Sequence, residues 1–181
     1  MEYLSSHSGY SDLLPLDARF IVNHTHVSWP EIRWAQEKGL IGWRTVKQLA
    51  EVDLESGLSG DELSRLAVLT KDDASTSSDL VLSLAARRPA PDPMVVQKKW
   101  MYLLLKKLYD NKNHIADPYG LVEQIYADFD YPEELAGFIR WMPATEPVAT
   151  LEEGASRMDR KWQKYLETAA IEFGQQSGAP H

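Results

Sequence analysis

Helix-forming patterns recur from residue 28 to residue 173, and they constrain the fold more than any other feature of the sequence. The clearest is a stripe of apolar side chains near the end of the chain, formed by Met158, Trp162, Leu166, Ala169 and Phe173. Steps of three or four residues match one face of an α-helix and not the alternation of a β-strand. No convincing alternating strand occurs elsewhere, so the sequence predicts an all-α fold.

Capping residues divide this pattern into about eight helices. Ser28 and Glu31 have the spacing of a capping box, and Gly39 suits the end of the helix expected over 29–38. A second such pattern, at 59–62, is expected to open another helix, and Asp117 and Thr150 are expected to cap two more. Asp130, followed by Pro132 in the first turn, is expected to cap a helix that ends before Pro143. Further helices are predicted from residue 43 to before residue 56, over 80–88, and from residue 93.

The chain of 181 residues fits a single helical domain with an ordinary hydrophobic core. Residues 1–27 have no clean period, so the type of their structure stays open and loose packing is expected there. The polar run 71–78 predicts a loop, and three prolines within 89–93 predict an extended linker. Residues 174–181 are expected to fray.

Composition excludes several classes of protein. With 44% hydrophobic and 25% charged residues the chain matches a folded globular protein, and its net charge of −8 argues against binding to nucleic acid. The absence of cysteine excludes disulfides and thiolate metal sites. The amino terminus lacks a secretory pattern, and the longest apolar run, residues 100–105, is far shorter than the roughly 20 residues that span a bilayer. We therefore expect a cytoplasmic protein that does not enter a membrane.

The negative charge is concentrated in one stretch of the sequence, residues 110–153. This stretch holds ten acidic and two basic residues, whereas the rest of the chain holds 17 of each. Its most distinctive part, 125–143, interleaves carboxylates with aromatic rings, a composition suited to a basic protein partner. The residues predicted to contact that partner are Asp128, Asp130, Tyr131, Glu133, Glu134, Arg140 and Trp141.

The sequence offers few signs of catalysis. Asp128 and Asp130 flank one residue and could hold a divalent cation, which would suit a metal-dependent hydrolase or transferase. No phosphate-binding loop and no Gly-x-Ser-x-Gly elbow accompanies them. His24 and His26 would share one face of a strand, but no third metal ligand is apparent nearby. We therefore predict neither catalytic residues nor a metal or other cofactor.

Basic and aromatic residues outside the acidic stretch have simpler interpretations. The lysine pairs at 98–99 and 106–107 form a basic stripe on the helix expected from residue 93, and it is expected to be solvated or to pair with the acidic stretch. Five of the six tryptophans are expected to serve the core for the most part. Trp141 is the exception, because an adjacent Arg and Trp are typical interface anchors.

Several of these motifs resemble a bacterial family known as domain of unknown function 2247. The resemblance rests on Ser28-Trp-Pro-Glu-Ile-Arg-Trp34 with Gly39, on Lys99-Trp100, on the string Glu123-Gln-Ile-Tyr-Ala-Asp-Phe-Asp-Tyr-Pro-Glu-Glu134, and on Phe138-Ile-Arg-Trp-Met-Pro143. It covers much of residues 28–166. The family type implies a small bacterial protein encoded beside polymorphic toxin genes, where acidic proteins often act as immunity factors. It supplies no catalytic residues.

Three hypotheses follow from the sequence. The first is an immunity protein that binds and neutralises a basic cognate toxin through the acidic, aromatic stretch. The second is a metal-dependent hydrolase or transferase that uses Asp128 and Asp130. The third is a non-catalytic scaffold protein.

Overall fold

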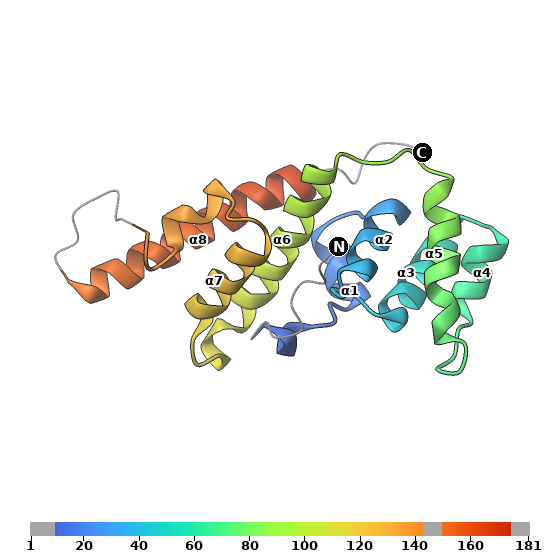
Figure 1. Ribbon diagram of the computed structural model, residues 1–181, viewed down its shortest axis with the longest axis horizontal. Helices are drawn as coiled ribbons and strands as arrows, with labels where there is room; N and C mark the ends of the chain where they lie inside the picture. Colours follow the sequence, from blue (N-terminus) through green and yellow to red (C-terminus); the bar gives the residue numbers. More distant parts are fainter. Residues whose placement is uncertain (1–9, 143–149, 175–181) are drawn as a thin grey trace. The chain divides into compact units, whose positions relative to one another are not determined.

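The structure of the protein, a computed structural model, describes residues 10–142 and 150–174. These residues form eight α-helices and four short 3-10 helices, and they contain no β-strand (Figure 1). The α-helices are α1 (Ala18–His24), α2 (Trp29–Glu37), α3 (Trp43–Glu55), α4 (Asp61–Ala67), α5 (Ser77–Ala86), α6 (Pro93–Asn111), α7 (Pro118–Asp128) and α8 (Leu151–Gly174). The 3-10 helices are η1 (Ser11–Leu13), η2 (Ala74–Thr76), η3 (Lys112–His114) and η4 (Glu133–Phe138). The predicted all-α fold with about eight helices is confirmed.

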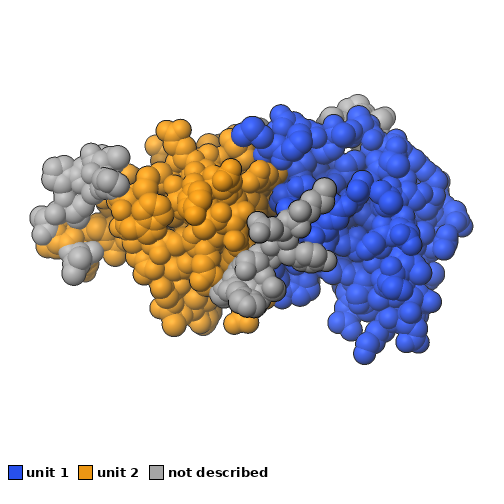
Figure 2. Space-filling model, viewed as in Figure 1, with its two compact units in different colours: residues 1–4, 14–96 blue, residues 5–13, 97–181 orange. Residues whose placement is uncertain are grey.

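Contacts between Cα atoms divide the chain into two compact units (Figure 2). Unit 1 comprises residues 1–4 and 14–96 and contains α1 to α5. Unit 2 comprises residues 5–13 and 97–181 and contains η1, most of α6, α7, η4 and α8. Because this division does not test whether either unit folds alone, the single domain stays a prediction.

Three of the predicted helix caps are confirmed. Glu31 Oε2 accepts hydrogen bonds from the backbone N of Ser28 at 2.6 Å and from its Oγ at 2.8 Å, which completes a capping box. Asp117 Oδ1 accepts a bond from Gly120 N at 3.0 Å, and Thr150 Oγ1 accepts one from Glu153 N at 3.1 Å. The three bonds donated by backbone amides satisfy N–H groups at helix starts that have no partner within the helix.

Other sequence expectations in unit 1 were wrong. The serine at position 59 was expected to cap a helix, but it lies one residue before the N-cap. Gly60 is the N-cap of α4, and no side chain caps that helix. The predicted loop 71–78 contains η2, and α5 begins at Ser77 rather than at residue 80. The loosely packed start is also corrected, because Leu16 and Ile21 are fully buried. The expectations for residues 1–9 and 175–181 lie outside the described residues.

The core of unit 1 forms where α3 packs against α4 and where α2 packs against α5. Its fully buried residues include Leu40, Val46, Leu66 and Val81. Trp29 contributes both its ring and its polar atom, since its Nε1 donates to Asp53 Oδ2 on α3 at 2.9 Å. This bond satisfies the buried indole N–H and joins α2 to α3.

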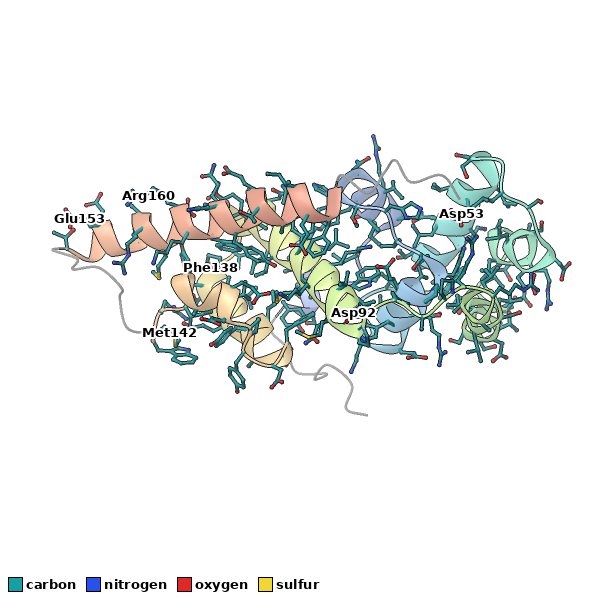
Figure 3. All side chains as sticks on the ribbon, turned by 90° about the horizontal axis from the view of Figure 1, so that it is seen from above. Asp53, Asp92, Phe138, Met142, Glu153 and Arg160 are labelled. Carbon is teal, nitrogen blue, oxygen red and sulfur yellow. The ribbon has the colours of Figure 1, made fainter. Side chains whose placement is uncertain are left out.

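The core of unit 2 forms around α6. Residues 100–105, the longest apolar run of the sequence, are each at most 1% exposed. The predicted stripe on α8 is confirmed, with Trp162, Leu166, Ala169 and Phe173 buried. Rings from other elements contact Trp162: Tyr109 of α6 edge-on at 5.1 Å between centroids, and Phe138 of η4 stacked at 6.0 Å. Phe138 thus lies where η4 packs against α8 (Figure 3).

The capping box of α2 provides a direct test of local stability. We predict that Glu31→Ala lowers the free energy of unfolding by about 1–2 kcal/mol. The substitution removes the carboxylate that accepts hydrogen bonds from the backbone N–H and the hydroxyl of Ser28. Urea denaturation followed by circular dichroism measures the change. Glu55→Ala, which removes an exposed carboxylate at the end of α3, is the control and should change the value by less than about 0.5 kcal/mol. Equal effects of the two variants would contradict the capping role.

Candidate functional site

Two large exposed aromatic side chains in unit 2 contact the same buried ring. Tyr131 is 57% exposed and Trp141 is 60% exposed, and both contact the ring of Tyr126, which is only 5% exposed. The ring centroid of Tyr126 lies 5.2 Å from that of Tyr131 and 5.8 Å from that of Trp141, both in edge-on contact. We call these three residues the aromatic patch. Tyr126 fixes the positions of two rings that remain accessible to a partner.

The end of α7 places Tyr131 on this patch. The N–H of Tyr131 donates to the carbonyl of Tyr126 at 2.9 Å, and the N–H of Asp130 donates to that of Ala127 at 3.2 Å. These two bonds and the contact between the Tyr126 and Tyr131 rings define a Schellman motif, which usually has glycine at the position of Asp130. Asp130 and Tyr131 instead adopt left-handed backbone angles, with φ of 62° and 57°.

This turn corrects the role predicted for Asp130. The sequence suggested that its carboxylate caps the following helix, but the N-cap of η4 is Pro132 and no side chain caps it. The expected helix is the short η4, which does end before Pro143. Left-handed backbone costs a non-glycine residue on the order of 1–2 kcal/mol, and such strain is often found at functional sites. Two consecutive strained residues therefore mark the edge of the aromatic patch.

The predicted contact carboxylates fall into two groups. Asp128 is half-buried and accepts a hydrogen bond from Tyr10 Oη at 2.6 Å, and Glu134 forms an ion pair with Lys98 at 3.0 Å. The hydrogen bond and charge of Glu134 raise the pKa of Lys98. Asp130 and Glu133 are exposed, and neither carboxylate has a hydrogen bond or ion pair within the described residues. These two carboxylates, on either side of Tyr131 in the chain, are the ones available to a partner.

Arg140 is held within unit 2. Its Nε and Nη2 lie 2.9 and 3.0 Å from the two carboxylate oxygens of Glu123, and its Nη1 and Nη2 lie 3.0 and 3.2 Å from those of Asp117. The hydrogen bonds to Glu123, then those to Asp117, raise the pKa of Arg140, so that it stays charged. Arg140 was predicted to contact a partner. In the structure its guanidinium instead binds Glu123 on α7 and Asp117, the residue that caps the start of α7. There it holds the backbone beside Trp141.

The charge concentrated in the sequence is not concentrated in one unit. Unit 2 contains 14 acidic and 10 basic residues, and unit 1 contains 13 and 9, so each has a net charge of −4. Lys98 and Lys106 from the predicted basic stripe pair with Glu134 and Asp110, as one interpretation of that stripe expected. The acidic stretch therefore acquires cations on folding that its own sequence lacks.

The candidate metal ligands do not form part of a larger ligand group in the described residues. Within residues 10–142 and 150–174, no group of three His, Asp or Glu side chains lies close enough to hold a metal ion. His24 ends α1 rather than lying in a strand, and its Nδ1 is 2.7 Å from the carbonyl of Phe20. In the same part of the chain no helix is long and apolar enough to cross a membrane.

Tyr10 and Tyr126 are the residues of this site that could not be selected from the sequence. Tyr10 is 118 residues from its partner Asp128, and no local pattern predicts that contact. Tyr126 belongs to the apolar face predicted for α7, and this pattern predicts its burial. The pattern does not predict that its ring contacts two exposed rings.

The described residues thus form an all-helical protein. It has an exposed aromatic patch and, next to it in the chain, two carboxylates without a partner among those residues. The chain belongs to a bacterial family described as an uncharacterized protein conserved in bacteria, DUF2247, whose model matches residues 18–170. The matched region contains the whole aromatic patch, and the resemblance inferred from the sequence motifs is confirmed at the level of the family. No curated protein and no solved structure matches the chain.

The left-handed turn can be tested by substitution of Asp130. We predict that Asp130→Val lowers the free energy of unfolding by about 1–2 kcal/mol, because a β-branched residue is strained at positive φ. Asp130→Gly should change it by less than about 0.5 kcal/mol, since the relief of strain is offset by the larger entropy of the unfolded chain. Urea denaturation of both variants measures the difference. Equal stability of the valine and glycine variants would contradict the turn.

Proposed function

We propose that this protein is a non-catalytic binding protein that uses the aromatic patch and the carboxylates of Asp130 and Glu133 to bind a basic protein. The observation that carries the proposal is the simultaneous exposure of Tyr131 and Trp141 on one buried ring. Large exposed rings with fixed positions lose little side-chain entropy on binding, and they are typical anchors of protein interfaces.

The charges around the patch support a basic partner. Asp130 and Glu133 flank Tyr131, whereas Arg140, the cation nearest to Trp141 in the sequence, already binds Asp117 and Glu123. A partner would therefore meet negative groups beside the rings and an arginine whose charge is offset. Opposite charges on the partner would accelerate association and favour one orientation.

The partner we propose is the catalytic domain of a secreted bacterial toxin, which makes this protein its immunity factor. Support comes from the negative net charge, the exposed anchors, and the family type, for which the resemblance implies a place beside toxin genes. The protein would neutralise the toxin by occupying its active site or by blocking access of the substrate.

Binding should depend on the two exposed rings. We predict that Trp141→Ala and Tyr131→Ala each raise the Kd for the toxin encoded beside this gene about tenfold or more, because interface anchors typically contribute this much. Isothermal titration calorimetry and inhibition of the toxin's activity provide the two measurements. Ile171→Ala, which removes a side chain that is 64% exposed on α8, is the control and should leave Kd unchanged.

Failure has two distinguishable forms. If the wild-type protein neither binds the toxin nor inhibits it, the proposed function is wrong. If it binds and the Trp141 and Tyr131 variants bind equally well, the function stands and the assignment of the site is wrong.

Charge reversal tests the acidic part of the surface. Glu133 is preferable to Glu134 because reversal at Glu134 would also break its ion pair with Lys98. We predict that Glu133→Lys slows association with the toxin about three- to tenfold at physiological salt, where the Debye length is about 8 Å and local charges dominate. Stopped-flow fluorescence measures the rate.

Asp72→Lys is the matched control. It makes the same change of net charge at an exposed residue of unit 1, and Asp72 has no hydrogen bond or ion pair within the described residues. It should slow association by less than twofold. Equal effects of the two reversals would mean that total charge, and not the surface beside the aromatic patch, governs the encounter.

A further inference from the structure

A pocket of about 450 Å³ lies within unit 1, where one face of α2 meets the end of α5 and the start of α6. Its volume falls in the range of small-molecule sites, roughly 300–1,000 Å³. From α2 it is lined by Pro30, Arg33, Trp34 and Glu37, which share one face because they are spaced three or four residues apart. The rest of its wall comes from 85–96 and is mostly alanine and proline, with Arg88 as its only charged side chain.

The two arginines of this pocket retain hydrogen-bond donors. Arg33 uses Nε to bind Glu37 Oε1 at 2.7 Å, and its two Nη atoms have no hydrogen-bond partner within the described residues. The guanidinium of Arg88 has neither a hydrogen bond nor an ion pair in that part of the chain. Its neighbour Arg87, by contrast, binds Glu62. The pocket therefore contains planar donors suited to an oxyanion, in a protein whose net charge is negative.

The remaining walls favour a flat apolar group. Trp34 is half-buried and lines the pocket with Pro30, Pro91 and Pro93. Tryptophan and proline side chains present rigid surfaces against which an aromatic ring can pack at low entropic cost. Glu37 offsets one of the two arginine charges, so the lining has a net charge of +1. A ligand with a single negative group at one end of a ring system would match this arrangement.

We propose that this pocket binds a small aromatic anion, with its carboxylate or phosphate held by Arg33 and Arg88 and its ring packed against Trp34. This site lies in unit 1 and does not depend on the proposed binding of a toxin by unit 2. Arginine can form two parallel hydrogen bonds with either kind of oxyanion, so the chemistry of the site accommodates both.

Titration of the whole protein with three probes tests the proposal. The probes are naphthalene-2-carboxylate, its uncharged carboxamide, and 1-naphthyl phosphate, and the signal is the indole N–H of Trp34 in a ¹H–¹⁵N NMR spectrum, identified with Trp34→Phe. We expect a saturable shift with at least one anion, and an affinity for the preferred anion at least tenfold above that for the carboxamide. A preference for the phosphate or the carboxylate identifies the group that the pocket recognises. No saturable shift with either anion up to 10 mM, roughly the weakest useful affinity, would overturn the proposal.

Substitution of neighbouring arginines supplies the control. Arg88→Gln should weaken binding of the preferred anion at least fivefold, and Arg87→Gln should leave it unchanged, because Arg87 is bound to Glu62. Both residues are exposed, so thermal unfolding should show that both variants remain folded. Equal affinities of the two variants, or equal binding of the carboxamide and the preferred anion, would show that the arginines do not recognise the charge.

Discussion

Burial of the middle of α6, residues 100–105, on every side is the constraint on which unit 2 depends. Six consecutive residues, 100–105, are buried, and six residues exceed one turn of an α-helix, so this part of α6 has no face left for solvent. Other elements must cover it. Within unit 2 the ring of Tyr102 contacts Phe173 of α8 at 6.0 Å, and Gln97 Nε2 donates to the carbonyl of Phe129 at 3.1 Å. The acidic stretch therefore forms part of the cover over α6.

Because the acidic stretch covers α6, some of its large apolar side chains are buried and others remain exposed. Phe129, Leu135, Phe138 and Ile139 are buried, whereas Tyr131 and Trp141 are not. The difference arises from local geometry: the Schellman motif turns the chain at Tyr131, and the bonds of Arg140 hold the backbone beside Trp141. Exposed rings and left-handed non-glycine residues both cost stability. The proposed binding role would explain why both occur together at one place in the fold.

Much of the fold could be predicted because local sequence determines helix starts. Ser28, Asp117 and Thr150 cap their helices through bonds that reach only three residues along the chain. Asp130 was misassigned for a physical reason: aspartate suits both an N-cap and a left-handed turn, and the choice depends on contacts of Tyr126 and Tyr131. In the candidate site the exposure of Trp141 agrees with its predicted role, but the internal binding of Arg140 does not follow from any local pattern.

The distribution of charge along the sequence differs from its distribution in the folded protein, and this difference bears on how a partner would be recognised. A sum along the sequence places all of the excess charge in 110–153, yet Lys98 and Lys106, outside that stretch, pair with two of its acids. Since each unit has a net charge of −4, long-range attraction of the proposed basic partner would be shared by the whole chain. Selectivity for one surface must then come from contacts that act within a few ångströms. Packing of Tyr131 and Trp141 against the partner would meet that requirement and would govern the rate of dissociation. The carboxylates of Asp130 and Glu133 would govern the final orientation of the encounter.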